Sequence, residues 1–188
     1  MKHSRLLPAA AVGVLSALIL APAAAFAQDD ATQYVGMGDS YASGHGAGDY
    51  DDSDCSRSAN AYGPLLAAKL PADLNFVACS GAKIPDVNAD QMPALSADTG
   101  LVTISVGGND VGFSDIITTC TTGSDDTCIA RIEEAEEIGR TQVAGELATL
   151  YADMATAAPN AQVIVVGYPK LFHEQECGSA LGISVTEQ

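Results

Sequence analysis

The sequence predicts an α/β fold in which helices cover both faces of a parallel β-sheet. Short apolar runs typical of buried strands alternate along the chain with segments of helical periodicity. Small polar turns that contain glycine follow the apolar runs. Because ligands of such sheets bind at the carboxyl ends of the strands, these turns are also where a functional site is expected.

The first 27 residues are expected to be a signal peptide. Two basic residues precede an apolar stretch, and Ala25-Phe26-Ala27 has the small-residue form of a signal-peptidase site. An uncleaved membrane anchor is the alternative, but Pro22 and the small residues before Gln28 favour cleavage. Cleavage leaves one domain, residues 28–188, which is long enough to bury a sizeable core.

The exported part is strongly acidic. All 24 Asp and Glu residues but only 6 of the 8 Lys and Arg residues follow residue 27, which gives a formal charge of −18. This charge repels nucleic acid and anionic lipid and favours solubility. We therefore expect no nucleic-acid partner and no stable membrane insertion after cleavage. The complete protein is expected to be a monomer.

Four apolar runs are expected to form the strands of the sheet. Three of them, all except Leu74–Ala78, look like strands buried on both faces, because they are continuous rather than alternating. In chain order they are Thr32–Met37, the weaker Leu74–Ala78, Leu101–Val106 and Gln162–Val166.

Two segments between these strands have the periodicity of helices. The first is Tyr62–Leu70, and the second runs from about Thr127 to Ala157, where Gly139 could divide it in two. Ser124 and two aspartates precede the long segment, as helix capping and the helix dipole favour. EEAEE at 133–137 predicts a solvated face. The apolar stripe that predicts core packing consists of Val143, Leu147, Leu150 and Met154.

Three polar turns follow the first three strands in chain order. Residues 38–44 read GDSYASG, residues 79–82 read CSGA and residues 107–110 read GGND. Because parallel strands end at a common edge, these turns are expected to converge. Each also has an ordinary structural explanation: Ser40 could be a helix cap, CSGA a bridged loop and the two glycines a tight turn.

The residue types in these turns suit acyl transfer, which needs a nucleophile, oxyanion donors and a general base. Ser40 could be the nucleophile, because the glycine before Asp39 allows a sharp bend. The Ser40 amide, the Gly81 amide and the side-chain NH₂ of Asn109 could donate to the oxyanion.

Together, these three motifs resemble those of the SGNH, or GDSL-type, hydrolases, and within them the secreted bacterial lipase/esterase branch. The resemblance covers residues 32–175 and implies a flavodoxin-like α/β/α sandwich, the SGNH hydrolase fold. It also implies that a secreted enzyme cleaves carboxylic (lipid or small acyl) esters through an acyl-enzyme. It implies Ser40 as the nucleophile, with an oxyanion hole formed by Ser40, Gly81 and Asn109. Asp39 looks like part of the turn rather than the catalytic acid.

All five cysteines lie in the exported part, where disulfides can form. Local spacing favours Cys120 with Cys128 and then Cys55 with Cys79, although spacing alone leaves the connectivity open. The similar secreted lipases imply the same two disulfides. Cys177 then has no partner in this sequence.

We expect no metal site and no cofactor. The sequence has no C-x-x-C motif, and His45 and His173 are isolated, so no spacing resembles a zinc site. An EF-hand loop starting at Asp49 would need Gly and Glu where this sequence has Asp54 and Asn60. The acidic run at 49–54 is therefore expected to be a solvated loop.

The general base of the family is a His in an Asp-x-x-His motif near the C-terminus, and this sequence has no such motif. Ala42 and Lys170 stand three residues before His45 and His173, so neither histidine is assigned as the base. With the unpaired Cys177, this leads us to expect a C-terminally truncated domain. The alternative is a catalytically dead SGNH-like domain that binds an acyl or glycan ligand.

Overall fold

The computed structural model describes residues 31–171. The expected signal peptide, His173 and Cys177 lie outside these residues. In the described segment, no helix combines the length and the apolar character that crossing a membrane requires.

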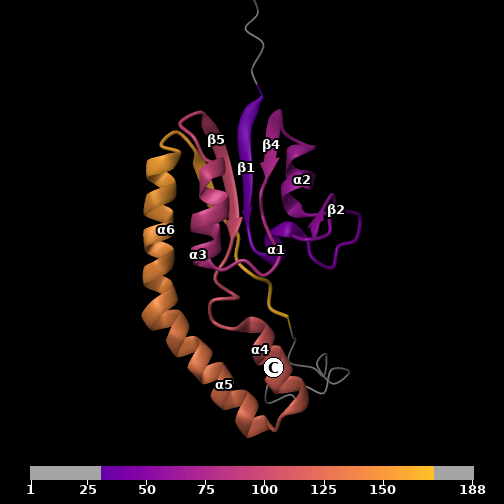
Figure 1. Cartoon of the computed structure of the whole chain (residues 1–188), viewed down its shortest axis with the longest axis vertical. Helices are drawn as coiled ribbons and strands as arrows, with labels where there is room; N and C mark the ends of the chain where they lie inside the picture. Colours follow the sequence, from indigo (N-terminus) through magenta and orange to yellow (C-terminus); the bar gives the residue numbers. More distant parts are fainter. Residues whose placement is uncertain (1–30, 172–188) are drawn as a thin grey trace, which may run out of the picture.

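Four parallel strands form the central sheet in the order β4-β1-β5-β6 (Figure 1). β1 lies between β4 and β5, so its end contacts the ends of two neighbours. This confirms the predicted α/β class and parallel sheet. The strands are β1 (Thr32–Gly38), β4 (Ala72–Phe76), β5 (Thr99–Ser105) and β6 (Gln162–Val165).

β4 starts and ends two residues before the predicted strand Leu74–Ala78. Its pairing with β1 stops where Phe76 lies opposite Gly36. The amides of Val77 and Ala78 both donate to the Gly36 carbonyl, so the chain leaves the sheet here. The bounds of the other three strands agree with the prediction to within two residues.

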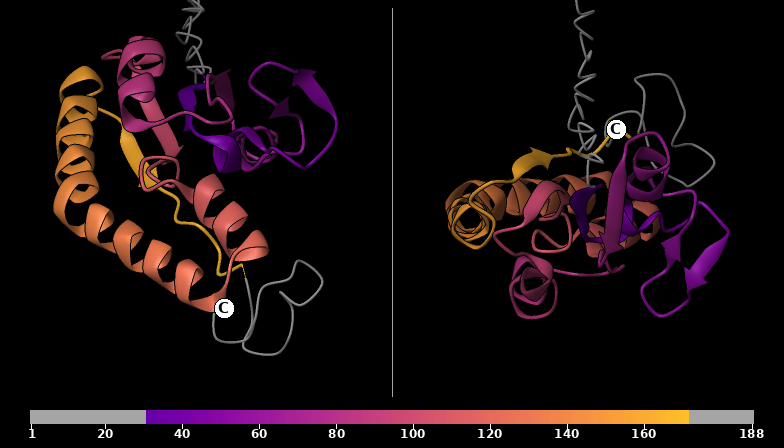
Figure 2. Two further views of the ribbon diagram at one scale, coloured as in Figure 1. Left: turned by 60° about the horizontal axis from the view of Figure 1, so that its bottom comes forward. Right: turned by 90° about the horizontal axis from the view of Figure 1, so that it is seen from above.

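One face of the sheet carries the main hydrophobic core. Helices α3 (Ile84–Asp86), η1 (Val87–Gln91) and α6 (Ala144–Ala157) cover this face (Figures 1 and 2). The fully buried side chains of this core are Met37, Val87, Val102, Ile104, Leu150 and Met154.

The opposite face is covered by α2 (Tyr62–Ala67), which is shorter than the predicted helix Tyr62–Leu70. Gly63 of α2 packs on this face, where a Cβ at position 63 would lie 3.5 Å from both the Phe76 ring and the Tyr34 hydroxyl, an ordinary van der Waals contact. Tyr34 is fully buried and shares a hydrogen bond of 2.7 Å with Thr103. Helices therefore lie on both faces, as predicted, but β6 is not buried on both faces, because Ile164 and Val165 are exposed.

The long helical segment follows one continuous curved path (Figure 2). α5 (Asp125–Ile138) passes through the π-helical turn η3 (Gly139–Val143) into α6, so Gly139 begins a π turn rather than a break. The Ser124 hydroxyl caps α5 by accepting from the Thr127 amide. Three residues of the predicted apolar stripe, Val143, Leu150 and Met154, are buried in the core. The fourth, Leu147, is partly buried.

The acidic run at residues 49–54 contains a short strand where the sequence predicts only a loop. β2 (Tyr50–Asp52) pairs antiparallel with β3 (Arg57–Ser58), and Arg57 forms an ion pair with Asp52 across this hairpin. Strands of two or three residues are too short for hydrophobic periodicity to indicate. The other elements that the sequence patterns do not predict are α1 (Ser40–Ser43), α3, η1, η2 (Met92–Ala94) and α4 (Phe113–Thr122).

Candidate active site

The three polar turns converge at the edge of the sheet where β1, β4 and β5 end, as the sequence predicts. Gly38 and Asp39 join β1 to α1. The CSGA turn follows β4, and the GGND turn follows β5. Hydrogen bonds between these turns define the geometry of the site.

Gly38 makes the sharp turn at the end of β1 possible. Its φ is +125°, in the region that favours glycine, and a Cβ built on it would lie 2.1 Å from the Ser105 carbonyl oxygen. The next amide, that of Asp39, donates to the same Ser105 oxygen at 2.8 Å. The backbone of β1 and β5 therefore leaves no room for a side chain at position 38.

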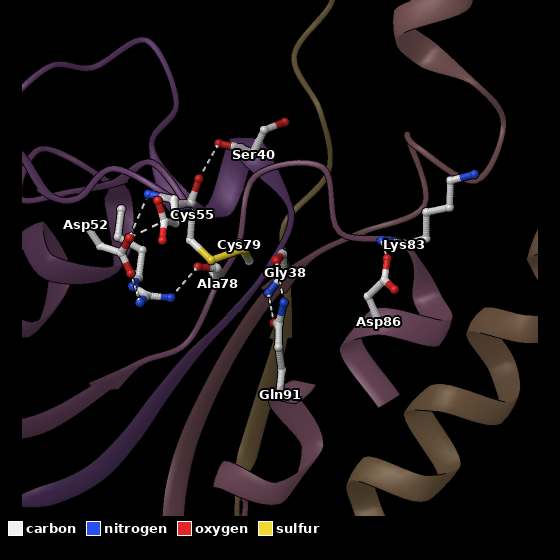
Figure 3. Close-up of a disulfide and its surroundings, with 12 residues drawn as sticks. Gly38, Ser40, Asp52, Cys55, Ala78, Cys79, Lys83, Asp86 and Gln91 are labelled. Carbon is white, nitrogen blue, oxygen red and sulfur yellow. Dashed lines mark hydrogen bonds and ion pairs between the residues drawn. A yellow bond between two sulfur atoms is a disulfide. The ribbon is translucent and has the colours of Figure 1, made fainter. Parts of the chain in front are cut away.

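Asp39, not Ser40, is the N-cap of α1. Its side chain is buried, and Oδ1 accepts from the Tyr41 amide at 3.0 Å. Ser40 is the first helical residue, and its side chain points away from the disulfide below it (Figure 3). Within residues 31–171 the Ser40 hydroxyl has no hydrogen-bond partner, so it is available to a ligand.

The CSGA turn is attached to the Ser40 turn and to the β2–β3 hairpin. The Cys79 amide donates to the Gly38 carbonyl at 2.9 Å, and a disulfide joins Cys79 to Cys55 (Figure 3). Gly81 has a φ of +86°, and a Cβ there would meet no atom within 4 Å. A cavity of about 460 Å³ lies beside Gly81. The turn thus presents Gly81 next to open space.

Two side chains of the GGND turn hold the CSGA turn and the start of α3. Asn109 Nδ2 donates to the Ala82 carbonyl at 2.9 Å. The carboxylate of Asp110 accepts from the Ile84 amide at 3.0 Å, and burial raises the pKa of Asp110. One of the two amide hydrogens of Asn109 remains available, because a single hydrogen bond uses only one.

Tyr168, which follows β6, closes the network between the first and third turns. Its hydroxyl donates to Asp39 Oδ2 and accepts from the Gly108 amide at 3.2 Å. Burial and the neighbouring Asp39 carboxylate raise the pKa of Tyr168, so the hydroxyl stays protonated at neutral pH. The three turns and Tyr168 therefore form a closed ring of hydrogen bonds, which we call the turn ring.

Sequence reasoning missed Tyr168 and gave Asp110 no role. A signal for Tyr168 was present, since it follows a predicted strand and must lie at the same sheet edge as the three turns. Cys120 and Cys128 form a second disulfide, which joins α4 to α5 and lies outside the turn ring.

His45 lies close to Ser40 in the chain but does not engage the hydroxyl. Its backbone amide donates to the Ser40 carbonyl at 3.0 Å, while its side chain is exposed. It is the single histidine in residues 31–171. Within that segment, no histidine is hydrogen-bonded to the Ser40 side chain.

Comparison with known proteins decides the family. A model of the GDSL-like lipase/acylhydrolase family matches residues 37–181, a segment that contains all three turns. The chain belongs to the GDSL-like lipase/acylhydrolase family. The match covers more than half of the chain and includes Ser40, Gly81 and Asn109.

Relatives of this GDSL-like chain occur in Streptomyces. Lipase 1 of Streptomyces coelicolor is 46% identical over 174 residues, which are 86% of this chain and 65% of that protein. A lipase of Streptomyces rimosus is 42% identical over 182 residues, which are 95% of this chain and 66% of that lipase. The chain thus spans about two thirds of the length of these curated relatives.

Two crystal structures share the fold of this GDSL-like chain. Phospholipase A1 from Streptomyces albidoflavus has a TM-score of 0.80 and 42% sequence identity, over 84% of this chain and 67% of that one. The extracellular lipase from Streptomyces rimosus has a TM-score of 0.74 and 43% sequence identity, and the match covers 76% of this chain and 62% of the lipase chain. The α/β fold is therefore that of lipase structures.

The ionisation of Asp39 is expected to make this GDSL-like protein less stable as the pH rises. Burial raises the pKa of Asp39, against the lowering effects of its hydrogen bonds from Tyr168 and Tyr41. The folded state therefore binds this proton more tightly than the unfolded state. The associated stability is fully present below the unfolded-state pKa and is lost as the pH rises through the folded-state pKa.

The variant Asp39→Asn tests this sign, because it stays neutral while the amide oxygen can still accept a hydrogen bond. Urea unfolding at pH 3.5 and pH 7 gives the stability of variant and wild type. We expect the variant to be relatively more stable at pH 7 than at pH 3.5. Asp110 also has a raised pKa, but it is present in both proteins, so its effect cancels. The opposite trend would show that the fold favours the charged form of Asp39.

Proposed function

We propose that this chain carries the nucleophile and the oxyanion hole of a secreted serine hydrolase that cleaves carboxylic esters. The observation that carries the proposal is the turn ring, which holds the Ser40, CSGA and GGND turns together while the Ser40 hydroxyl stays unbonded. Membership of the GDSL-like lipase/acylhydrolase family supports the same chemistry.

In the proposed reaction, Ser40 Oγ attacks the ester carbonyl carbon as its proton passes to a general base. The carbonyl oxygen becomes an oxyanion that accepts hydrogen bonds from the Ser40 amide, the Gly81 amide and Asn109 Nδ2. As this tetrahedral intermediate collapses, the base passes the proton to the leaving oxygen, so that a neutral alcohol departs and the acyl group stays on Ser40. Water then attacks the acyl carbon as the base takes its proton, and the base returns this proton to Ser40 Oγ when the carboxylic acid is released.

The base in this proposal is a histidine from outside residues 31–171, because the exposed His45 has no hydrogen bond to the nucleophile. The named activities of the relatives, lipase and phospholipase A1, favour lipid esters as substrates. The extracellular lipase among them and the two disulfides of this chain favour a secreted enzyme. The mechanism requires neither a metal nor a cofactor.

The test uses the protein expressed from its complete reading frame, beside the chain that ends at Gln188. Both are assayed with p-nitrophenyl esters and then treated with a p-nitrophenyl alkylphosphonate, which phosphonylates an activated serine. Mass spectrometry should locate the adduct on the peptide that contains Ser40, with loss of ester turnover. Binding of an ester with neither turnover nor adduct would instead support the catalytically dead, ligand-binding alternative.

Removal of the Asn109 carboxamide is expected to impair the chemical step. In Asn109→Ala, kcat should fall by about 10²–10³-fold with little change in KM, because one oxyanion donor is lost. Stopped-flow and steady-state kinetics with one p-nitrophenyl ester separate the two parameters.

A matched control is Asn160→Ala. Asn160 Nδ2 also donates to a backbone carbonyl, that of Ala97 at 3.0 Å, but it lies at the far end of β6 from the turn ring. We expect its kcat to stay within about twofold of wild type. Equal losses in the two variants would argue against Asn109 as an oxyanion donor.

A further inference from the structure

Gln91, at the end of η1, is bonded twice to the residue that starts the nucleophile turn. The Gly38 amide donates to Gln91 Oε1 at 2.7 Å, and Gln91 Nε2 donates to the Gly38 carbonyl at 2.9 Å (Figure 3). Only 2% of Gln91 is exposed. Neither the sequence motifs nor the proposed mechanism gives this buried carboxamide a role.

The end of the β1–β4 pairing explains why a carboxamide is needed at this place. In a parallel sheet, the amide and carbonyl of one residue face the same neighbouring strand. Gly38 faces the side of β4, whose pairing with β1 has already ended at Phe76. Cys79 still donates to the Gly38 carbonyl, but Gln91 is the group that accepts from the buried Gly38 amide. Gln91 thus takes the place of a missing strand partner.

The opposite side of this turn is held by β5, where the Asp39 amide donates to the Ser105 carbonyl at 2.8 Å. Gly38 and Asp39 are therefore fixed from two sides, directly before Ser40. The rotation of the Gly38 peptide groups decides where the Ser40 amide and hydroxyl point. The contacts from Cys79 and Ser105 to these peptide groups are made by backbone atoms, whereas those from Gln91 are made by a side chain and can be removed by mutation.

Gln91 also acts on the second turn of the site. The Gly38 carbonyl accepts from both Gln91 Nε2 and the Cys79 amide, so movement of this oxygen displaces the CSGA turn as well. Gln91 lines the same cavity as Gly81. A single carboxamide is thereby coupled to the nucleophile turn and to an oxyanion donor.

We propose that Gln91 is a positioning residue that sets the orientation of Ser40 relative to Gly81, an inference that rests on the proposed esterase function. Misplacement of a nucleophile by about 1 Å costs on the order of 100-fold in rate. Loss of Gln91 should therefore lower kcat much more than it changes KM.

Replacing Gln91 by glutamate distinguishes a role in positioning from a role in packing alone. A glutamate at this position has nearly the same shape, but its carboxylate offers only acceptors and would place one against the Gly38 carbonyl. When the glutamate is protonated, its OH can donate to that carbonyl again. The charged groups around position 91 are Arg57, Asp86 and Asp90, which line the cavity, and Asp39 beyond Gly38. These four charged groups are present in both the variant and the wild type, so their titration affects both activities alike.

The experiment compares Gln91→Leu, Gln91→Glu and Tyr34→Phe in the protein expressed from its complete reading frame. Tyr34→Phe is the control because it removes another buried side-chain hydrogen bond, to Thr103, at a distance from the turn ring. For Gln91→Leu we expect kcat to fall about 100-fold with KM within about threefold. Tyr34→Phe should keep kcat within about twofold. The ratio of Gln91→Glu to wild-type activity should rise as the pH is lowered from 8 to 5.

The inference is overturned if folded Gln91→Leu keeps kcat within about twofold of wild type, or if Tyr34→Phe loses as much. If Gln91→Leu does not fold, Gln91→Glu decides: an activity ratio independent of pH overturns the proposal. Failure of the esterase proposal is recognised separately, because wild type would then show no turnover that Ser40→Ala abolishes. In that case the positioning role is overturned with it.

Discussion

Ser40→Ala is expected to lower ester turnover by about 10⁴–10⁶-fold and to leave the free energy of unfolding almost unchanged. The loss in rate follows from removal of the proposed nucleophile, after which only binding and the oxyanion donors can assist the reaction. The stability is expected to hold because the Ser40 hydroxyl has no hydrogen-bond partner within residues 31–171. The helix cap is also intact, since Asp39 provides it.

A suitable control is Ser114→Ala. Ser114 also lies in the first turn of a helix, α4, but its side chain is exposed and it makes none of the hydrogen bonds of the turn ring. Turnover of a p-nitrophenyl ester and urea unfolding would be measured for both variants. Ser40-independent turnover would contradict the proposed mechanism and would require a different nucleophile, whereas a large loss of stability would show that Ser40 has a structural role.

Gly38→Ala should have the largest effect on stability of any single methyl addition at the site. A Cβ at position 38 would lie 2.1 Å from the Ser105 oxygen, 2.8 Å from its nitrogen and 2.9 Å from the Ala42 Cβ, and φ is +125°. Two of these atoms are backbone of the central sheet, which cannot move without breaking the β1–β5 pairing. We expect a loss of more than about 3 kcal/mol, or no folded protein.

The control Gly46→Ala measures the cost of a positive φ without the steric clash that a Cβ would meet at position 38. Gly46 also has a positive φ, +88°, but a Cβ there meets nothing within 4 Å. This variant should therefore lose only about 1–2 kcal/mol, the usual cost of the left-handed region. Urea unfolding, followed by circular dichroism, gives both values. Similar losses for the two variants would mean that the Gly38 turn relaxes and that close packing against Ser105 is unimportant.

The parts of this fold that could be predicted from the sequence are those with local signals. Continuous apolar runs indicated the four strands, and the apolar stripe of α6 indicated the covered face. The convergence of the three turns followed from the rule that parallel strands end together. The functional roles of Ser40, Gly81 and Asn109 stay predictions, to be tested by the variants described above.

The supporting contacts of the site had no local signal. Gln91 and Gly38 are separated by 53 residues, and Tyr168 and Asp39 by 129 residues. A glutamine in a short helical turn looks like any surface residue until the fold shows that the adjacent strand has ended. The end of β4 is likewise set by its pairing with β1, which has no local signal, so the predicted end lies two residues beyond the observed one.

The turn ring also implies an order of assembly. Its last contact comes from Tyr168, which reaches Asp39 across 129 residues of chain, so it forms only after β6 has joined the sheet. Contacts of such long sequence separation carry a large loop-closure cost and form late in folding. A nascent chain that has produced only the first three strands of the sheet already contains Ser40 and Gln91 but lacks Tyr168, the side chain that closes the turn ring. Completion of the site is thus tied to completion of the sheet.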